Sequence, residues 1–330
     1  VTATDADGAM GVENFTYTVS NPSPMSTPIS NQVANDGASI NLNVAPNFTD
    51  EDNMTFGATG LPGGLTISPA GVITGTIDPS ASQAMTGGVY NIVVTATDAD
   101  GAMRVENFTY TVSNLAPIVT MIPDQTGDDG LDLTATVDLD LSNFFSDDDM
   151  LTFSATNLPT GVTVTPSGVV TGMIDTSASQ GGVGGVYNVT ATATDADGAV
   201  TNANFNYTVS NPVPDSTLIM NQTANDGAMV NFDVAPNFTD EDSISFTATG
   251  LPMGLTMSPA GLITGTIDSS ASQAMTGGVY NIAVTATDAD GAMTLENFTY
   301  TISNPAPFAT GLSNQVASDG DTVNFNVAPN

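Results

Sequence analysis

The chain of 330 residues carries 35 acidic side chains and one basic side chain, Arg104, which gives a formal net charge of −34. Such a charge repels nucleic acids and anionic lipid surfaces, so neither is expected as a partner. The sequence has no Cys, His or Lys, which excludes disulfides, imidazole catalysis and Schiff-base or P-loop chemistry. No apolar run approaches the roughly 18 residues that a membrane-spanning helix needs, so membrane insertion of this segment is not expected.

A short block with the letters TDADGA recurs four times along the chain. Its first aspartates are Asp5, Asp98, Asp195 and Asp288, at spacings of 93, 97 and 93 residues. Recurrence at a fixed period indicates tandem modules. We expect complete modules at 21–113, 114–210 and 211–303, between the end of a preceding module (1–20) and the start of a following one (304–330), in a window on a longer array. The longer spacing reflects four extra residues between Gly130 and Phe145.

Apolar and polar residues alternate with a period of two in each module, which is typical of β-strands. In the first module, strands A to G are expected near residues 30, 41, 56, 66, 74, 93 and 109, separated by turn sequences such as NDG and LPGG. Seven short strands in about 93 residues predict an all-β protein, with antiparallel immunoglobulin-like β-sandwiches repeated along a linear rod. The side chains expected in the core include Tyr90, Ile92, Val94, Ala96, Met54 and Met150.

Acidic loops of consecutive modules should meet at each junction. If every strand reverses direction, the B–C loop (49–53) and the F–G loop (98–101) face the preceding module, while the A–B turn and the E–F loop face the following one. DADG by itself is also a common hairpin turn that needs no ligand. Adjacent carboxylates repel each other, however, and Ca²⁺ favours six to eight oxygen ligands, so Ca²⁺ is the expected cofactor. The first junction is expected to gather Asp36, Asp78, Asp147, Asp148, Asp149, Asp195 and Asp197.

The stretch FTDEDNMTFGATGLPGGLTISPAGVITGTID, followed by VYNIVVTATDADGA, resembles the dystroglycan-type cadherin-like repeats of bacterial surface proteins. It is also similar to the related immunoglobulin-like repeats marked by LPxGL…GxIxG. The resemblance covers essentially the whole chain and implies extracellular tandem modules with Ca²⁺ at their junctions. By this resemblance, Asp50 and Asp52 match a D-x-D ligand pair, Asp98 matches a ligand after strand F, and Asp78 stands at the acidic E–F motif. The linkers lack the family's acidic run, which implies fewer or weaker ion sites.

The predicted metal ligands lie at both ends of every module. At the ends that face a preceding module they are Asp50, Asp52, Asp98, Asp100, Asp147, Asp149, Asp195, Asp197, Asp240, Asp242, Asp288 and Asp290. At the ends that face a following module they are Asp78, Asp175 and Asp268.

The leading functional hypothesis is a non-catalytic, extracellular structural array on a bacterial cell surface. Such an array would be a calcium-stiffened stalk, or a fibre or sheath component, of a large surface protein or adhesin. Its partners would be neighbouring repeats, with lateral or end-to-end assembly of copies into a filament. The alternative is an adhesive module that binds a glycan or another surface protein. Paired carboxylates are the one catalytic chemistry left, and because they recur in every module, an enzyme is not expected.

Overall fold

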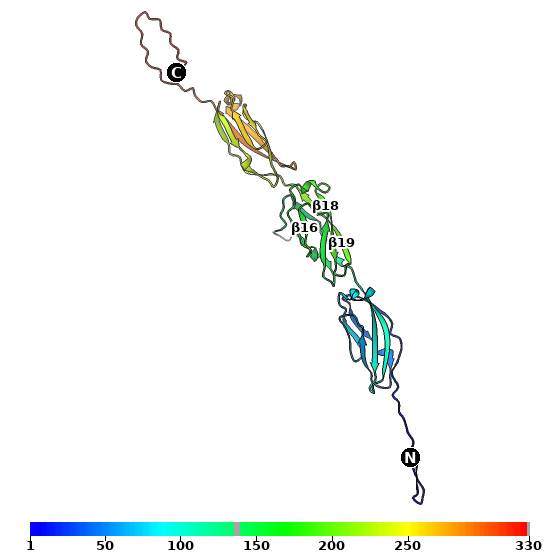
Figure 1. Ribbon diagram of the computed structural model, residues 1–330. Helices are drawn as coiled ribbons and strands as arrows, with labels where there is room; N and C mark the ends of the chain where they lie inside the picture. Colours follow the sequence, from blue (N-terminus) through cyan, green and yellow to red (C-terminus); the bar gives the residue numbers. More distant parts are fainter. Residues whose placement is uncertain (135–138, 329–330) are drawn as a thin grey trace.

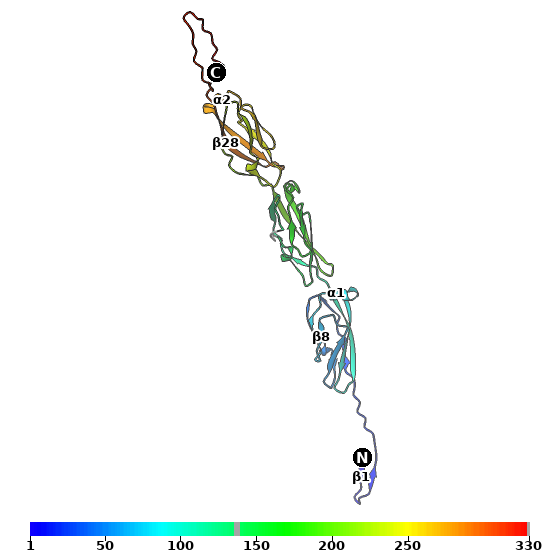
Figure 2. The same cartoon turned by 60° about the vertical axis from the view of Figure 1, so that its left-hand side comes forward.

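Three β-sandwiches follow one another along an extended line, with the two chain ends at opposite extremities (Figures 1 and 2). The computed structural model describes residues 1–134 and 139–328. The four residues between these ranges belong to the stretch predicted to lengthen the second module, so that part of the prediction lies outside the described residues. The linear arrangement of sandwiches agrees with the rod predicted from the repeats.

A long antiparallel hairpin forms the two central strands of the four-stranded sheet in each sandwich. In the first module, alternate residues of the first hairpin strand are buried, and Ile92 and Val94 are 0% exposed. Their neighbours Val93 and Thr95 point to the other face of the sheet. The predicted period of two and its inward face are therefore confirmed. The hairpin strands are β10 (Val89–Thr97) and β11 (Met103–Ser113), β18 (Val186–Thr194) and β19 (Val200–Ser210), and β27 (Val279–Thr287) and β28 (Met293–Ser303).

Two sheets face each other in the first module. One has the order β4-β11-β10-β7, in which β4 and β11 run parallel, and the other has the order β5-β9-β8. Strands β3 and β6 form a separate short pair. The remaining elements are β3 (Met25–Ser26), β4 (Gln32–Asn35), β5 (Ser39–Asn43), η1 (Ala45–Asn47), β6 (Phe48–Thr49), β7 (Thr55–Thr59), β8 (Leu65–Ile67), β9 (Val72–Thr76), α1 (Ala81–Ala84) and η2 (Thr86–Gly88).

The third module repeats this topology, with sheets β21-β28-β27-β24 and β22-β26-β25. Its other elements are β20 (Asp215–Ser216), β21 (Gln222–Asn225), β22 (Met229–Asp233), η5 (Ala235–Asn237), β23 (Phe238–Thr239), β24 (Ser245–Thr249), β25 (Leu255–Met257), β26 (Leu262–Thr266), α2 (Ala271–Ala274) and η6 (Thr276–Gly278).

The second module differs on the sheet that carries strand B. Two isolated bridges, Asp132 to Met173 and Asp140 to Val169, stand on either side of the undescribed residues. Its four-stranded sheet keeps the order β13-β19-β18-β15. Its other elements are β12 (Ile118–Val119), β13 (Gln125–Asp128), η3 (Leu141–Asn143), β14 (Phe145–Ser146), β15 (Thr152–Thr156), β16 (Val162–Val164), β17 (Val170–Gly172) and η4 (Ala178–Gln180).

Each module has a hydrophobic core of its own. The three core clusters share no residue, and each draws only on its own sandwich. A buried aliphatic side chain contributes about 1.5–3 kcal/mol, so each module holds the apolar contacts that a separate domain needs. Stability therefore resides within the modules, and their relative placement depends on the junctions.

One predicted core residue of the second module lies at the surface. Met150 is 81% exposed, so its prediction is wrong, whereas Met54 packs on the core of the first module as expected. With a spacing of 97 residues between the modules, Met54 is equivalent to Leu151 and not to Met150. Leu151 packs on the second core, and the preceding position faces solvent because side chains alternate along the chain.

The segments outside the sandwiches are extended. The first 20 residues contain a hairpin of β1 (Thr2–Thr4) and β2 (Met10–Val12). Residues 304–328 form a loop at the other extremity (Figure 1). Side chains of both segments are exposed.

Candidate cation site at the module junctions

The acidic B–C loop of each module is anchored by a buried aromatic side chain. In the second module, Phe145 packs edge-to-face on Phe153, with ring centroids 5.7 Å apart. Two residues on, the Asp147 carboxylate accepts a hydrogen bond from the Asp149 amide at 3.0 Å. The first and third modules repeat both contacts. The loop is thus fixed at the tip of the sandwich with its acidic side chains outside the core.

The first aspartate of DADG has a structural role in its own turn. Asp195 is buried, and its Oδ1 accepts a hydrogen bond from the Ala199 amide at 2.8 Å. The linker side chain Asn114 donates to Asp195 Oδ2 at 3.1 Å. Equivalent bonds hold Asp98 and Asp288. The hairpin interpretation of DADG therefore accounts for this aspartate, which is already supplied with donors.

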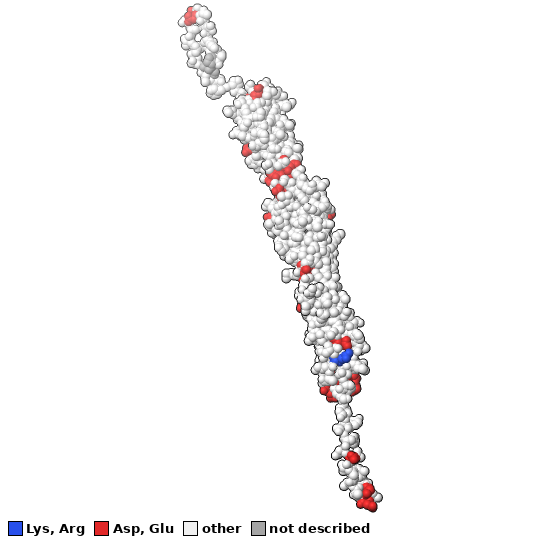
Figure 3. Space-filling view, turned by 45° about the vertical axis from the view of Figure 1, so that its right-hand side comes forward, with Lys and Arg blue, Asp and Glu red and all other residues white. Residues whose placement is uncertain are grey.

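Close contacts show which loops face each other across a junction. A Cβ added to Gly37, in the A–B turn of the first module, would lie 2.2 Å from Asp148 Oδ2 in the B–C loop of the second. At the next junction, a Cβ on Gly130 would lie 2.9 Å from the Cβ of Glu241. The A–B turn of one module thus meets the B–C loop of the next, as strand alternation predicts. Figure 3 shows acidic side chains gathered at the second junction.

At the first junction, one carboxylate of the first module faces five of the second, namely Asp36 against Asp147, Asp148, Asp149, Asp195 and Asp197. Burial raises the pKa of Asp149 to about 6, and the charges of Asp197 and Asp148 add to the rise. Burial also raises the pKa of Asp36; the nearby hydroxyl and amide of Ser82 oppose that rise and the charge of Asp197 adds to it. A carboxyl group whose pKa is raised in this way has no nearby positive charge that compensates for its burial.

The second junction has the same composition, with Glu241 in the place of Asp148. Asp129 faces Asp240, Glu241, Asp242, Asp288 and Asp290. Burial raises the pKa values of Asp240, Glu241 and Asp290, and neighbouring carboxylate charges raise them further. The single basic side chain, Arg104, pairs with Glu106 on the first module at 3.5 Å, so neither junction draws on it for neutralisation.

Seven buried side-chain oxygens have no hydrogen-bond partner among the described residues, and every one lies at a junction. They are Asp36 Oδ2, Asn114 Oδ1 and Asp149 Oδ2 at the first, and Asp129 Oδ2, Asn211 Oδ1, Asp240 Oδ2 and Asp242 Oδ2 at the second. Asp36 and Asp129 are only 5% and 4% exposed. A buried acceptor without a donor is costly, so two separate junctions present the same unmet need for positive charge.

These oxygens fit a hard cation by their chemistry. Carboxylate and amide oxygens are the ligands that Ca²⁺ takes, at flexible distances. Within residues 1–134 and 139–328, no group of three or more acidic side chains is already arranged to hold a metal ion. The fit therefore rests on the unpartnered oxygens and on the surplus of acceptors over donors.

The E–F aspartates have a different environment from the other predicted ligands. Asp175 accepts hydrogen bonds from the Ser177 amide and hydroxyl at 3.0 and 2.7 Å. Asp268 is held in the same way by Ser270, and these bonds lower the pKa of both carboxyls. Asp78 is exposed, and its Oδ2 lies 2.6 Å from where a Cβ of Gly63 would be. The structure thus places these three beside their own module's loops, while their role as ligands stays a prediction.

The predicted ligands of the first module's other end have the same local structure without a facing sandwich. The Asp52 amide donates to Asp50 Oδ1 at 2.9 Å, and the Asp100 amide donates to Asp98 Oδ1 at 3.0 Å. Extended residues precede this end in the described chain (Figure 2). The Asp50–Asp52 contact is therefore the same as its counterparts at the two junctions.

Sequence reasoning missed the residue that bridges each junction. Ser82 Oγ donates to Asp197 Oδ2 at 2.6 Å, and Ser179 Oγ donates to Asp290 Oδ2 at 3.2 Å. The second aspartate of DADG, unlike the first, thus reaches the preceding module. The signal in the sequence was the triplet Ala-Ser-Gln, which occurs at the same place in all three modules.

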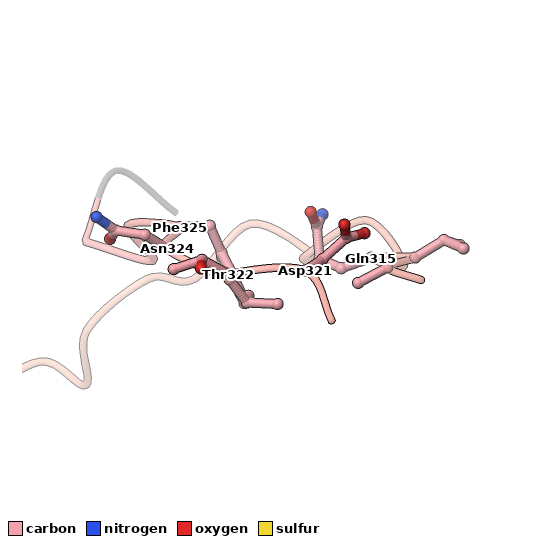
Figure 4. Close-up of a pocket in the computed structure, with 8 residues that line it drawn as sticks. Gln315, Asp321, Thr322, Asn324 and Phe325 are labelled. Carbon is pink, nitrogen blue, oxygen red and sulfur yellow. The ribbon is translucent and has the colours of Figure 1, made fainter. Parts of the chain in front are cut away.

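A hollow of about 360 Å³ lies in the C-terminal segment (Figure 4). Its lining includes Gln315, Asp321, Thr322, Asn324 and Phe325, all of them exposed. One acidic side chain lines it, and it lies apart from both junctions, so it contributes nothing to the cation site. Among the residues that the structure describes, none of the helices has the length and apolar character needed to cross a membrane.

The sandwiches match one protein family, described as "Putative Ig domain", over residues 23–113, 116–210 and 212–303. The matches cover most of the chain, so the chain belongs to this family, as three tandem copies of its domain. Repeat domains of this kind are typically extracellular and non-catalytic. No curated protein matches the chain.

Solved structures with similar folds include cadherins and an adhesin. Drosophila N-cadherin EC1-3 is 15% identical, with 84% of this chain and 99% of that chain covered and a TM-score of 0.33. The human desmocollin-1 ectodomain is 13% identical, with coverages of 96% and 69% and a TM-score of 0.32. The sialic acid binding region of the Streptococcus sanguinis SK1 adhesin is 16% identical, with coverages of 87% and 79% and a TM-score of 0.28. At such TM-scores these likenesses carry no functional inference.

Proposed function

We propose that this chain is part of a non-catalytic extracellular array whose module junctions bind Ca²⁺, and that the bound ions stiffen the rod. The array would serve as a stalk, or as a fibre or sheath component, of a large bacterial surface protein of the dystroglycan-type cadherin-like kind. One observation carries the proposal: all seven buried side-chain oxygens that lack a partner among the described residues lie at the two junctions.

At the first junction the ion would be held by oxygens from both modules. Asp36 comes from the first module, Asp149 and Asp197 come from the second, and Asn114 comes from the linker between them. Because these ligands belong to different bodies, holding them together fixes the angle between the two sandwiches. The equivalent residues of the second junction are Asp129, Asp242, Asp290 and Asn211. When bound, Ca²⁺ supplies positive charge and accepts six to eight oxygens.

Electrostatic repulsion opposes the docked state when no cation is present. Two unit charges 4 Å apart repel by about 1 kcal/mol in water and about 4 kcal/mol near a protein surface. Six carboxylates meet at each junction, so their summed repulsion reaches several kcal/mol. A bound divalent ion converts this repulsion into attraction, and docking of the modules should therefore depend on it.

Small-angle X-ray scattering and thermal unfolding of the full chain, with Ca²⁺ and with a chelator, test this proposal. In Ca²⁺ we expect a narrow distribution of molecular lengths and a high unfolding temperature. Chelation should broaden the length distribution and lower the unfolding temperature. The double variant Asp36→Asn/Asp129→Asn should lose most of this response. Asp226→Asn, at the equivalent position of the third module, which faces no sandwich among the described residues, should keep it. Identical scattering in Ca²⁺ and chelator would overturn the proposal.

A second proposal, adhesion to a glycan, rests on one face of the second module. Thr190 and Thr192 of β18 donate to the side chains of Asn204 and Asn202 of β19 at 2.8 Å, which leaves a row of amide donors on a hairpin whose two strands carry no charged residue. The aromatic side chains that are largely exposed, such as Phe15, Tyr17 and Phe308, lie outside the sandwiches, so stacking platforms are scarce there. Binding to a glycan array that is lost in Asn202→Ala/Asn204→Ala would support adhesion.

Assembly of several chains is a further part of the proposal. The sandwiches expose edge strands such as β4 and β7, and unpaired strand edges favour lateral pairing. Copies that are each strongly acidic would associate only where cations or uncharged faces separate their carboxylates. Electron microscopy of the purified chain in Ca²⁺ distinguishes single threads from multi-chain fibres.

A further inference from the structure

One serine occupies the same place in all three modules, on the short helical turn between strands E and F. These residues are Ser82 on α1, Ser179 on η4 and Ser272 on α2. Each backbone amide donates to Oδ1 of the aspartate in its own A–B turn, at 3.0 Å for Asp36, 2.8 Å for Asp129 and 2.8 Å for Asp226. The serine backbone is therefore tied to its own module in the same way in every copy.

The serine hydroxyls differ between the two modules that are followed by a sandwich in the described part of the chain and the third, which is followed there by an extended segment. Ser272 Oγ donates to Asp226 Oδ2 of its own module at 2.5 Å. Ser82 Oγ instead donates to Asp197 Oδ2 of the following module at 2.6 Å, and Ser179 Oγ follows the same pattern. A hydroxyl has a single proton to donate, so each serine supplies one carboxylate or the other.

The choice of acceptor decides which carboxylate oxygen is left without a donor. Asp36 Oδ2 and Asp129 Oδ2 are buried and have no hydrogen-bond partner in residues 1–134 and 139–328, whereas Asp226 Oδ2 has the Ser272 hydroxyl. In the two modules that a DADG turn faces, this oxygen is thus unpartnered, and in the third module it is bonded to the serine. The same hydroxyl accounts for both observations.

We infer that this serine is the positioning residue of each junction, and that docking of the next module transfers its hydroxyl from its own A–B aspartate to the second aspartate of the incoming DADG turn. The ligand that it recognises is therefore the following module of the same chain. At a free module end, the serine satisfies its own aspartate. At a docked end, it fixes the register of the neighbour and exposes a carboxylate oxygen toward the junction.

The consequence for cations rests on the function proposed above. Docking creates the unpartnered Asp36 oxygen, and a cation that binds this oxygen favours the docked state. Docking of the next module and cation binding therefore strengthen each other, and each raises the equilibrium constant of the other by the same factor. Cation binding should accordingly be weaker at a free module end, where the serine hydroxyl competes for the oxygen, than at a junction.

Spin-label distances across the first junction test the inference, and the absence of cysteine from the sequence makes labelling direct. Labels at Thr74→Cys and Thr163→Cys, which are exposed and lie on different modules, would report how the two sandwiches sit.

In the wild type, Ser82→Ala removes one hydrogen bond from the docked state and one from the undocked state, so in chelator it should change the ratio of docked to undocked molecules only slightly. In an Asp36→Ala background the hydroxyl has only Asp197 as its carboxylate acceptor, and there Ser82→Ala should lower this ratio by about 10-fold or more, the loss expected for one hydrogen bond to a charged group. Ser179→Ala and Ser272→Ala are matched controls and should leave this distribution unchanged.

Two further variants separate the hydroxyl from general damage to the fold. In the Asp36→Ala background, Ser82→Thr keeps a hydroxyl and should restore the ratio. In the same background, Ser82→Ala combined with Asp197→Ala should cost no more than either change alone, because both remove the same bond. No effect of Ser82→Ala in the Asp36→Ala background, an equally large effect in the wild type, or fully additive effects in the cycle would overturn the inference.

The outcomes also distinguish this inference from the cation proposal. If the wild-type distances do not respond to Ca²⁺ while Ser82→Ala lowers the docked fraction of Asp36→Ala in chelator, the serine contact is upheld and the cation proposal fails. If Ca²⁺ narrows the wild-type distances and Ser82→Ala has no effect in the Asp36→Ala background, the cation proposal stands and the serine inference fails.

Discussion

The interior of each sandwich and the junction between sandwiches are opposite kinds of environment. In the core of the first module, Ile92 and Val94 are fully buried among apolar side chains. At its junction with the second, Asp36 is almost equally buried, yet one of its oxygens has no partner in the described part of the chain. Burial stabilises the first region by removing apolar surface from water, and destabilises the second by removing hydration from charge.

This difference separates what holds a module together from what holds two modules in line. The cores are independent of one another, so folding of a module does not require its neighbours. The junctions contain a surplus of acceptors, so the angle between modules depends on donors or cations that the junction recruits. A change in the core should therefore act on one module, whereas a change at a junction should act on the shape of the rod.

The largest expected effect is a cavity in one core. Ile92→Ala removes a side chain that is 0% exposed and should destabilise the first module by about 2–5 kcal/mol. Differential scanning calorimetry should show one transition moved to lower temperature and the other two in place. Val93→Ala, on the same strand and the opposite face, is the control and should cost much less. Equal shifts of all three transitions would show that the cores are not independent.

The next largest effect is expected for a glycine substitution within the first sandwich, compared with the same substitution in the DADG turn at its end. Gly64 has φ +83°, and a Cβ there would lie 1.9 Å from the carbonyl oxygen of Thr76. Gly64→Ala should therefore destabilise the first module by at least about 2 kcal/mol, since backbone must move. Gly101, in the DADG turn, has φ +94° with nothing within 4 Å of a Cβ, so Gly101→Ala should cost only about 1 kcal/mol. Urea denaturation of both variants measures the difference.

A smaller effect is expected where the core supports the junction. Tyr90 is buried, and its hydroxyl donates to the carbonyl of Ala81 at 2.7 Å, which anchors the turn that carries Ser82. Tyr90→Phe should cost about 1 kcal/mol in the first module because a buried carbonyl loses its donor. The same variant should broaden the distances across the first junction and leave the second unchanged. An effect on stability with unaltered distances would show that this anchor does not position the serine.

The smallest effect is a pH dependence that runs opposite to ordinary acid denaturation. The pKa of Asp149 is raised to about 6 in the folded junction, from 3.8. Between these values the folded state binds more protons than the unfolded state, so stability falls as pH rises from about 4 through 6. In chelator, the second module should gain at most about 1 kcal/mol when pH falls from 7 to 5, since the side chain is partly solvated. Thermal unfolding of the wild type and of Asp149→Asn, in which the gain should shrink, measures this.

Much of the fold could be predicted because its signals are local. Alternation along residues 89–97 defines which side chains enter the core, and strand reversal alone places the acidic loops at the module ends. The exposure of Met150 could also have been predicted, because the 97-residue spacing aligns Met54 with Leu151 and a shift of one residue exchanges the two faces of a strand. The aspartates of the candidate site were predictable as a group, while their division into separate roles was not.

The sequence by itself determined the repeat, the sandwich, and the concentration of carboxylates at the module ends, since each follows from spacing and alternation within one module. Only the tertiary structure decided that Asp195 serves its own turn while Asp197 reaches Ser82. It also decided that Asp36 and Asp129 are left with unpartnered oxygens. The contact between Ser82 and Asp197 joins residues 115 positions apart. It depends on the rotation of one sandwich against another, which no local pattern of residues encodes.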